Sequence, residues 1–549
     1  MTVEKLITDY IDIWSSALRI RSTAGRGNNG KIDQYGIKKL REFILELAVR
    51  GKLVPQDPND EPASELLKRI AAEKAELVKQ GKIKKQKPLP EISEDEKPFE
   101  LPIGWECARL GNTVAIIRGI TFPASEKHKE PSEGKVACLR TANVQDSIEW
   151  DDLLYVSESF VKRSEQFAEK GDIVMSMANS RELVGKVAYI YNIPTSSATF
   201  GGFLSVIRPY GFNAAFLMSV LRSPYIKSIL IDSSSQTTNI ANISLEKLNP
   251  LVISVPPIGE QNRIAFKLEE LMSLCDQLEQ QSLTSLDAHQ QLVEILLKTL
   301  VDSQNAEELA ENWARISQHF DTLFTTEASI DALKQTILQL AVMGLLIESA
   351  NFSQRSHLKK HLSFGPRNGL SPSEVKYETD VKVLKLGATS YGYLKLQEAK
   401  HVDIDTSDKL HLFLRKGDIL IQRGNSSNFV GCSLLIEKDF DNLIYPDLMM
   451  KIRTKDELFP EYAALWLSSP FARNYMWSKM TGTSGTMPKI SKKVVEDVPI
   501  AVPPLAVQHQ LVIKIKEIFF LCDSLKSRLQ LAQQIQLHLA DALTDAALN

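Results

Sequence analysis

The sequence predicts a mixed α/β protein with two globular domains, separated by two long antiparallel coiled-coil helices in a pseudo-twofold internal repeat. Three observations predict this class: a duplicated segment, a heptad pattern after each copy, and short β-branched strand signals that alternate with brief helix signals. At 549 residues the chain is too long for a single core, so several domain-sized units are expected.

The duplication is visible in segments that recur in the same order at a nearly constant separation. Residues 169–190 (EKGDIVMSMANSRELVGKVAYI) return as residues 415–436 (RKGDILIQRGNSSNFVGCSLLI). The turn VPPIGEQ at residues 255–261 returns as VPPLAVQ at residues 502–508. A separation kept over such a length indicates two copies of one unit.

A second repeat is permuted relative to the first. Residues 44–54 (ILELAVRGKLV) match residues 337–347 (ILQLAVMGLLI), so each half of the chain reads helix, globular domain, helix. The first half contains an additional charged stretch at residues 56–100, which is expected to form a short helix and a solvated linker. The expected segments are an N-terminal helical region (1–54), a charged helix and linker (55–99), a first globular domain (100–257), a central long-helix region (258–350), a second globular domain (351–504) and a C-terminal long-helix region (505–549).

Each VPP turn is followed by a helical stretch of about 40 residues, which would span roughly 60 Å. Apolar residues in both stretches alternate in steps of three and four, the a/d pattern of a coiled coil. Two such helices can pack antiparallel about a pseudo-twofold axis, and the two cysteines on the pattern are expected to be ordinary core residues. The predicted helix–helix seam consists of Ile264, Leu268, Leu271, Cys275 and Leu278 in the first copy and Leu511, Ile515, Ile518, Cys522 and Leu525 in the second.

Composition and missing motifs narrow the class of protein. Five cysteines without a C-x-x-C pair indicate neither a disulfide framework nor a cysteine zinc site, and no apolar run is long enough to span a membrane, so a cytoplasmic protein is expected. No P-loop, G-x-G-x-x-G, H-E-x-x-H or [DN]-P-P-[YFW] motif is present, so neither a metal nor a cofactor is expected on this chain. The net charge of −3 requires that any DNA contact use local patches or a partner that contacts the phosphates.

Polar, glycine-bearing loops recur at matching places in the two globular domains, whereas their tips differ. A shared framework with divergent tips is typical of two readers of different short DNA sequences, because Arg, Asn, Gln, Ser, Thr and Lys reach base edges and phosphates. An ordinary surface loop is the alternative at any single position. The candidate DNA-binding residues are Arg118, Thr121, Arg140, Asn143, Asn179, Arg181, Gln236, Thr237, Thr238, Asn239, Lys385, Arg423, Asn425, Ser426, Lys479, Thr483, Ser484 and Lys489, with no catalytic residue and no metal ligand.

Three segments together form a recognisable pattern: LPIGWECARLG at residues 101–111, residues 44–67, and residues 236–264 with their echo at residues 483–511. In these segments the chain resembles the specificity subunit of type I restriction–modification systems. The second copy departs from the pattern at two places: Val507 stands where the first copy has Glu260, and no L-P-x-G-W precedes the second globular domain.

The resemblance implies a non-catalytic, DNA-reading role. Each globular domain would be a target-recognition domain for one block of an asymmetric, two-block site in double-stranded DNA, and the helices would set the spacer between the blocks. Two modification (adenine methyltransferase) subunits would dock on the helices, and restriction subunits, which contain the translocase and nuclease, would join them. S-adenosylmethionine, ATP and Mg²⁺ would then be bound by the partner subunits only. Two alternatives remain open: a degenerate nuclease or transferase, and a scaffold or inhibitor that does not bind DNA.

Overall fold

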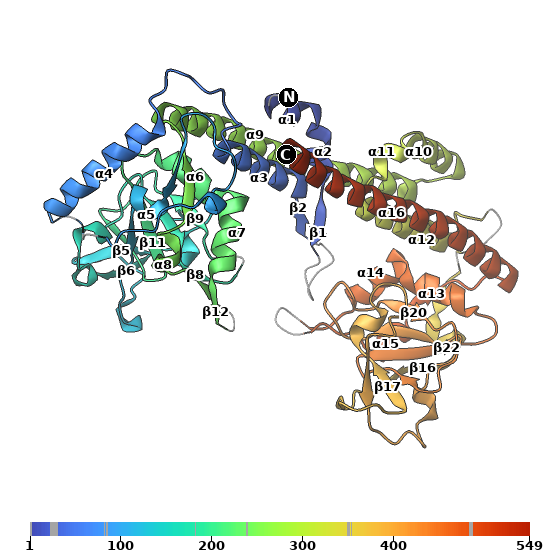
Figure 1. The fold of residues 1–549 in the computed structure, drawn as a ribbon. Helices are drawn as coiled ribbons and strands as arrows, with labels where there is room; N and C mark the ends of the chain where they lie inside the picture. Colours follow the sequence, from blue (N-terminus) through green and yellow to red (C-terminus); the bar gives the residue numbers. More distant parts are fainter. Residues whose placement is uncertain are drawn as a thin grey trace. The chain divides into compact units, whose positions relative to one another are not determined.

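The chain divides into two compact units in the computed structural model, which describes residues 3–21, 31–81, 83, 86–181, 183–237, 240–347, 352, 354–482 and 487–548. Each unit combines one predicted globular domain with parts of the helical regions (Figure 1). Unit 1 comprises Met1–Leu18, Gln34–Gln281 and Gln536–Asn549, and unit 2 comprises Arg19–Asp33 and Ser282–Ile535.

Unit 1 contains a four-stranded antiparallel sheet of order β4–β11–β7–β9. A second sheet has the order β10–β5–β6, in which β10 is parallel and β6 antiparallel to β5. Smaller sheets pair β12–β13–β8 and β14–β3. The strands of unit 1 are β3 (Glu106–Arg109), β4 (Val114–Arg118), β5 (Lys135–Leu139), β6 (Leu154–Ser157), β7 (Ile173–Ser176), β8 (Ala178–Asn179), β9 (Val187–Tyr189), β10 (Ala198–Phe200), β11 (Leu204–Pro209), β12 (Ser235–Thr237), β13 (Ile240–Asn242) and β14 (Val252–Val255).

Unit 2 repeats the topology of the two larger sheets. Its four-stranded antiparallel sheet has the order β16–β22–β19–β20, and its second sheet has the order β21–β17–β18 with β21 parallel to β17. The internal repeat predicted from the sequence is therefore a repeat of fold as well. The strands are β15 (Ser356–His357), β16 (Leu362–Asn368), β17 (Val381–Leu384), β18 (Ala399–Val402), β19 (Ile419–Gln422), β20 (Ser433–Leu435), β21 (Leu443–Ile444), β22 (Met449–Thr454) and β23 (Pro499–Ile500).

Short helices cover one face of each four-stranded sheet. In unit 1, Asn213 accepts a hydrogen bond at its side chain from the N–H of Phe216 and so caps the start of α6, whose residues Phe216, Leu217 and Val220 are buried. Ser223 and Ser469 cap the next helix in each unit, and each cap is followed by proline at the first helical position. The helices are α5 (Leu110–Thr113), α6 (Ala214–Arg222), α7 (Pro224–Ser233), α8 (Leu245–Leu248), α13 (Pro460–Ser468), α14 (Pro470–Ser478) and α15 (Lys492–Glu496).

The recurring V-P-P-x-x-x-Q turn connects each globular domain to a long helix. The buried Gln261 side chain donates to the carbonyl of Pro256 (2.9 Å) and accepts from the N–H of Asn213 (2.9 Å). Gln508 makes the same two bonds, to the carbonyl of Pro503 (2.7 Å) and from the N–H of Phe459 (2.8 Å). The glutamine therefore joins the long helix to the start of α6 or α13, which explains why it recurs.

The long helices are α9 (Ile258–Asp302) and α16 (Leu505–Leu548). Each packs beside a helix of the permuted repeat: α3 (Tyr35–Val49) lies along α9 in unit 1, and α12 (Glu327–Met343) lies along α16 in unit 2. Ion pairs at matching positions mark both contacts, Arg41 with Asp276 (2.6 Å) and Lys334 with Asp523. The permuted repeat thus supplies the same helical partner to each long helix.

The two long helices also share cores with each other. In unit 1 the beginning of α9, including Cys275, shares a core with Ala540 near the end of α16. In unit 2 the end of α9, including Leu297, shares a core with Cys522 in the middle of α16. These pairings run in opposite directions, as in the antiparallel arrangement predicted. Of the predicted seam, the following residues are buried: Ile264, Leu268, Leu271 and Cys275 in unit 1, and Leu511, Ile515 and Cys522 in unit 2.

The additional stretch of the first half, predicted as a short helix and a solvated linker, contains a helix and is attached to unit 1 at several points. Helix α4 (Ala63–Lys79) buries Leu66 and Ile70 in the core of unit 1. The chain that follows is held by Arg109, which is 4% exposed and donates to the carbonyls of Pro90 and Glu91 and to the Glu96 carboxylate. One face of this stretch is therefore packed against the globular domain of unit 1. Apolar positions at helical spacing in a charged helix are the signal for it.

The remaining elements lie in the helical regions. Among the described residues no single helix has the length and apolar composition to cross a membrane, although the bent pair α6–α7 passes that test jointly. The elements are α1 (Val3–Asp9), α2 (Ile11–Ser16), β1 (Arg19–Arg21) paired antiparallel with β2 (Lys31–Asp33), α10 (Ala306–Gln318) and α11 (Phe320–Leu323).

Candidate nucleic-acid interface

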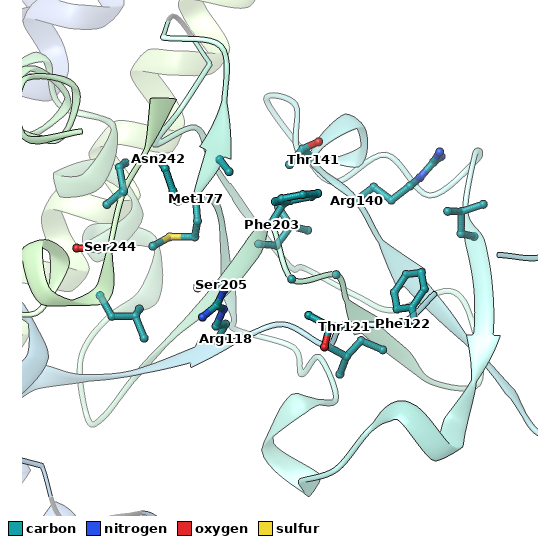
Figure 2. Close-up of a pocket in the computed structure, with 18 of the residues that line it drawn as sticks. Arg118, Thr121, Phe122, Arg140, Thr141, Met177, Phe203, Ser205, Asn242 and Ser244 are labelled. Atoms are coloured by element: carbon teal, nitrogen blue, oxygen red, sulfur yellow. The ribbon is translucent and has the colours of Figure 1, made fainter. Parts of the chain in front are cut away.

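An open cleft of about 800 Å³ lies within the globular domain of unit 1 (Figure 2). Three of the predicted DNA-binding residues line it, although they come from separate segments: Arg118 ends β4, Thr121 follows it, and Arg140 follows β5. The edges of both sheets therefore contribute to one concave surface. Ser205 and Ser244 add hydroxyl groups to the same surface.

A close approach of two backbone segments builds the wall that contains Thr121. A Cβ at Gly119 would overlap the carbonyl oxygen of Gly201, and the neighbouring Ile120 N–H donates to the Phe200 carbonyl at 2.8 Å. Only glycine fits where backbones come this close.

Unit 2 reproduces this wall with different residues around it. A Cβ at Gly369 would overlap the carbonyl oxygen of Tyr445, and the Leu370 N–H donates to that carbonyl at 3.0 Å. The glycines in IRGIT and RNGLS thus fix the same strand crossing in both copies.

A second shared feature is a pair of backbone hydrogen bonds made by one residue of each unit. The N–H of Met177 donates to the carbonyl of Phe203 (2.9 Å), and the carbonyl of Met177 accepts from the N–H of Ile243 (2.8 Å). In unit 2, the backbone N–H of Arg423 donates to the carbonyl of Leu448 (2.8 Å), and the carbonyl of Arg423 accepts from the N–H of Ile490 (2.9 Å). Met177 and Arg423 therefore occupy equivalent backbone positions.

The equivalences bring predicted residues of unit 2 to the positions that line the cleft in unit 1. Arg140 and Lys385 each immediately precede the short 3-10 turn that follows the central strand of the second sheet, at Thr141–Asn143 and Leu386–Thr389. Lys489, next to Ile490, corresponds to Asn242, next to Ile243. The framework is common, and the side chains on it differ in charge and size.

The cationic groups at these positions are only partly neutralised within the chain. Arg140 donates to the carboxylate of Asp152 (2.7 Å) and to its carbonyl (2.6 Å), while the Arg140 Nε is buried without a hydrogen-bond partner. The Arg423 Nε is also buried without a partner. Lys385 lies 3.6 Å from Glu374 and is exposed.

Three predicted amides have structural partners. Asn143 is 2% exposed, and its amide donates to the carbonyls of Glu149 and Asp152. Asn179 accepts from the N–H of Ser180 (2.8 Å), and Asn425 accepts from the N–H of Ser426 (2.7 Å).

These bonds give the N-S pair of the repeat a turn-forming role in each copy. DNA contact by Asn143, Asn179, Asn425 and Ser426 stays a prediction. Asn179 does line a smaller pocket of about 240 Å³, which shares Thr141 with the cleft.

Other candidates lie on the surface or outside the described residues. Arg181 and Lys479 are exposed, and Arg181 lies 4.0 Å from Asp232. Lys489 is exposed, and its backbone pairs with Thr481 to close a loop. Thr238, Asn239, Thr483 and Ser484 lie outside the described residues, as do the side chains of Gln236 and Thr237.

Among the cleft residues that were not predicted, an aromatic residue and a lysine are of functional interest. Phe203 lines the cleft with 70% of its surface exposed, and Lys127 lies at its edge. The signal for Phe203 is the G-G-F sequence, in which two glycines precede an aromatic residue at the start of a strand. Comparison of the repeats obscures it, because its counterpart Leu448 is an ordinary aliphatic residue.

Three groups outside the cleft have a shifted pKa: Glu260, Glu96 and Cys275. Burial raises the pKa of Glu260, and the hydrogen bond that this carboxylate accepts from Trp105 Nε1 (2.9 Å) opposes the rise. Hydrogen bonds from Arg109 lower the pKa of Glu96 to about 2. Burial raises the pKa of Cys275 to about 11, as for a core thiol. Among the described residues, no three His, Cys, Asp or Glu side chains gather closely enough to hold a metal ion.

Comparison with known proteins identifies the relatives of this chain. The family described as "Type I restriction modification DNA specificity domain" matches residues 102–288 and 368–535. The EcoEI and EcoAI type I restriction enzyme specificity subunits of Escherichia coli are 44% and 42% identical to it, with the whole of each chain covered. A solved chain from a study of complex assembly and conformational transition in the type I R-M system is 16% identical, with a TM-score of 0.49 over 82% of this chain and 99% of that one.

Proposed function

The chain belongs to the family of type I restriction–modification DNA specificity subunits, and on this premise we propose that its two recognition domains each read one block of an asymmetric, two-block DNA site through the cleft position described above. A role in DNA sequence specificity follows from the family. The assignment of one block to each domain rests on a single observation: both units build the same framework around this position, and the side chains on that framework differ.

The chemistry of the position supports base and phosphate contact. Arginine is the side chain most often used to contact guanine, and lysine, serine and threonine contact bases or phosphates. In unit 1 the cleft offers Arg118, Arg140 and Thr121, whereas the equivalent position in unit 2 offers Lys385, Arg423 and Lys489. Different sets of donors on one framework are suited to different base sequences.

The long helices support docking of two copies of one partner. Phe266 (73% exposed) and Leu274 lie eight residues apart on α9, and Ile513 (58%) and Leu521 (66%) occupy the matching positions on α16. Exposed apolar groups at the same places in each repeat offer the same surface twice.

We assign these surfaces to the two adenine methyltransferase subunits, which the restriction subunits then join. A specificity subunit of this family assembles with other subunits of its system and with DNA. The proposal includes three further points: two methyltransferase subunits bind each specificity subunit, α9 sets the length of the DNA spacer, and the complex acts in the cytoplasm.

The proposed role of this chain is positioning without catalysis. S-adenosylmethionine, ATP and Mg²⁺ would be bound by the partner subunits, and extrusion of the target adenine would take place in the methyltransferase. The absence of nucleotide-binding and methyltransferase motifs from the sequence supports this division. The alternative of a degenerate enzyme predicts that the purified chain alone, supplied with Mg²⁺ or a methyl donor, modifies DNA.

A methylation map of genomic DNA tests the proposal. Cells that express the modification subunit are compared with and without this gene, and loss of methyladenine from a gapped, asymmetric motif is expected when the gene is removed. Exchange of residues 100–255 for the equivalent domain of a relative should change one block and leave the other intact. A map that does not depend on the gene, despite verified expression, would favour a protein-binding scaffold.

A further inference from the structure

Phe203 is exceptional among the apolar side chains of the unit 1 cleft. Of the described apolar residues that line it, such as Ile120, Met177 and Ile243, only Phe203 is mostly exposed, at 70%. Figure 2 shows its ring between the group formed by Met177, Asn242 and Ser244 and the group formed by Thr121, Phe122 and Arg140.

The backbone that carries Phe203 is held on both sides. The Gly201 N–H donates to Leu139 (2.9 Å), the Leu204 N–H donates back to Gly201 (2.8 Å), and the Phe203 carbonyl accepts from Met177. The ring is therefore presented from a fixed turn at the junction of both sheets. Little backbone entropy is lost when a ligand contacts it.

The surroundings of the ring indicate its ligand. The charged side chains that line the cleft are Arg118, Lys127, Arg140 and Glu246, a cationic excess suited to DNA. On the groove edges of duplex DNA, the apolar group is the 5-methyl of thymine, and phenylalanine is one of the side chains that contact it.

We propose that Phe203 contacts the 5-methyl group of a thymine in the block read by the first domain, an inference that rests on the proposed function. Insertion of the ring between base pairs as a wedge fits the geometry less well. A wedge must project beyond its neighbours, whereas Phe203 lies between the walls of the cleft.

Unit 2 does not share this contact. The equivalent Leu448 is half-buried, and a Cβ at Gly424 would lie 3.2 Å from one of its methyl carbons. The proposed thymine contact therefore belongs to one block only, and Leu448 provides a matched control for the other domain.

The experiment uses the assembled complex with its modification subunits at one fixed salt concentration. Each thymine of the first block, as defined by the methylation map, is replaced by deoxyuridine, which removes only the methyl group. One such replacement should weaken binding by the wild-type complex about fourfold, the value for one buried methyl group. Phe203→Ala should abolish this sensitivity, whereas Tyr191→Ala, at an exposed aromatic residue outside the cleft, and Leu448→Ala should retain it.

The outcomes separate this inference from the proposed function. A first block without thymine, indifference of the wild-type complex to every deoxyuridine, or a Phe203→Ala variant that stays sensitive would each overturn the thymine contact while leaving the DNA-reading role intact. Equal weakening by Phe203→Ala on all sequences would indicate a wedge instead. Absence of any sequence-selective binding by the wild-type complex would contradict the proposed function itself. Because the ring is exposed, Phe203→Ala should unfold at the wild-type temperature, and Phe203→Leu provides a second, larger replacement.

Discussion

The two units pack the end of the permuted helix repeat against an aromatic ring, but with different residues. A glycine at the end of the permuted helix repeat meets an aromatic ring in each: a Cβ at Gly51 would lie 2.9 Å from Trp105, and one at Gly344 would lie 2.6 Å from Phe352. The Trp105 N–H is bonded to the buried Glu260, whereas phenylalanine has no such donor and Val507 stands where Glu260 would be. The second repeat lacks both the tryptophan of the L-P-x-G-W motif and the glutamate at the position of Glu260. These two departures are therefore linked, because the two side chains are partners. When the donor is lost, the buried acceptor is lost with it, because an unpaired buried carboxylate is costly.

The largest expected effects test whether the units fold independently. Gly369→Ala places a Cβ against the Tyr445 carbonyl, and Gly119→Ala places one against the Gly201 carbonyl. Each should cost about 3 kcal/mol of unfolding free energy, the upper end of the usual range for overpacking, and the loss should be confined to its own unit, because the clash is with backbone that cannot move easily. Hydrogen exchange resolved by unit measures this. Gly201→Ala, with its nearest contact at 3.5 Å, should be tolerated. Equal loss of protection in both units would contradict independent folding.

The glutamine junction should contribute to stability in both units, and slightly more in unit 2. Gln261→Leu removes two hydrogen bonds, whereas Gln508→Leu removes three, because Gln508 also donates to the Glu457 carbonyl (2.9 Å); each should cost roughly 2–3 kcal/mol. The exposed Gln290→Leu is the control. Thermal unfolding of the three variants provides the comparison. A much larger loss of stability for one variant than for the other would show that the same hydrogen-bond geometry contributes unequally to the stability of the two units.

A double-mutant cycle converts the polar pair of unit 1 into the apolar pair of unit 2. Trp105→Phe alone leaves the buried Glu260 carboxylate without its hydrogen-bond donor, and Glu260→Val alone leaves the indole N–H without its acceptor. Each should therefore cost about 1–3 kcal/mol of unfolding free energy. The double variant should recover about 1 kcal/mol relative to the sum, measured by chemical denaturation. Strict additivity would show that the two positions are not coupled.

The smallest effect is a dependence on pH. Burial raises the pKa of Glu260 above its unfolded value, so its protonated form is the better fit to the folded state. This contribution to stability is fully present below the unfolded pKa of about 4.5 and is lost as pH rises through the folded pKa. Glu260→Gln should flatten that slope in unit 1, as followed by denaturation at several pH values. If the dependence of stability on pH were unchanged in this variant, it would have to arise from other carboxylates.

The sequence repeat was sufficient to predict the duplicated fold, because a framework of glycines and buried residues constrains the chain locally. The role of α3 and α12 beside the long helices was not predicted, since periodicity shows that Leu268 faces a core and does not show which helix completes it. Likewise Asn143 carries a side chain suited to bases, yet its environment buries it. Candidate residues chosen by type alone cannot be separated from turn-forming ones until the backbone is known. Phe203 was missed for the opposite reason, because apolar residues are assigned to cores by default.

The glutamine at each junction has one further consequence. All of its partners are main-chain groups: a proline carbonyl and the N–H of Asn213 or Phe459 in both units, and also the Glu457 carbonyl in unit 2. Asn213 and Phe459 differ completely in side chain. The attachment therefore makes no demand on the identity of the incoming residue at the start of α6 or α13. Recombination could replace one recognition domain with an unrelated sequence of the same fold, and the new domain would be seated on the helix by the same pair of bonds. New specificities could thus arise by exchange of modules, without any compensating change in the helices.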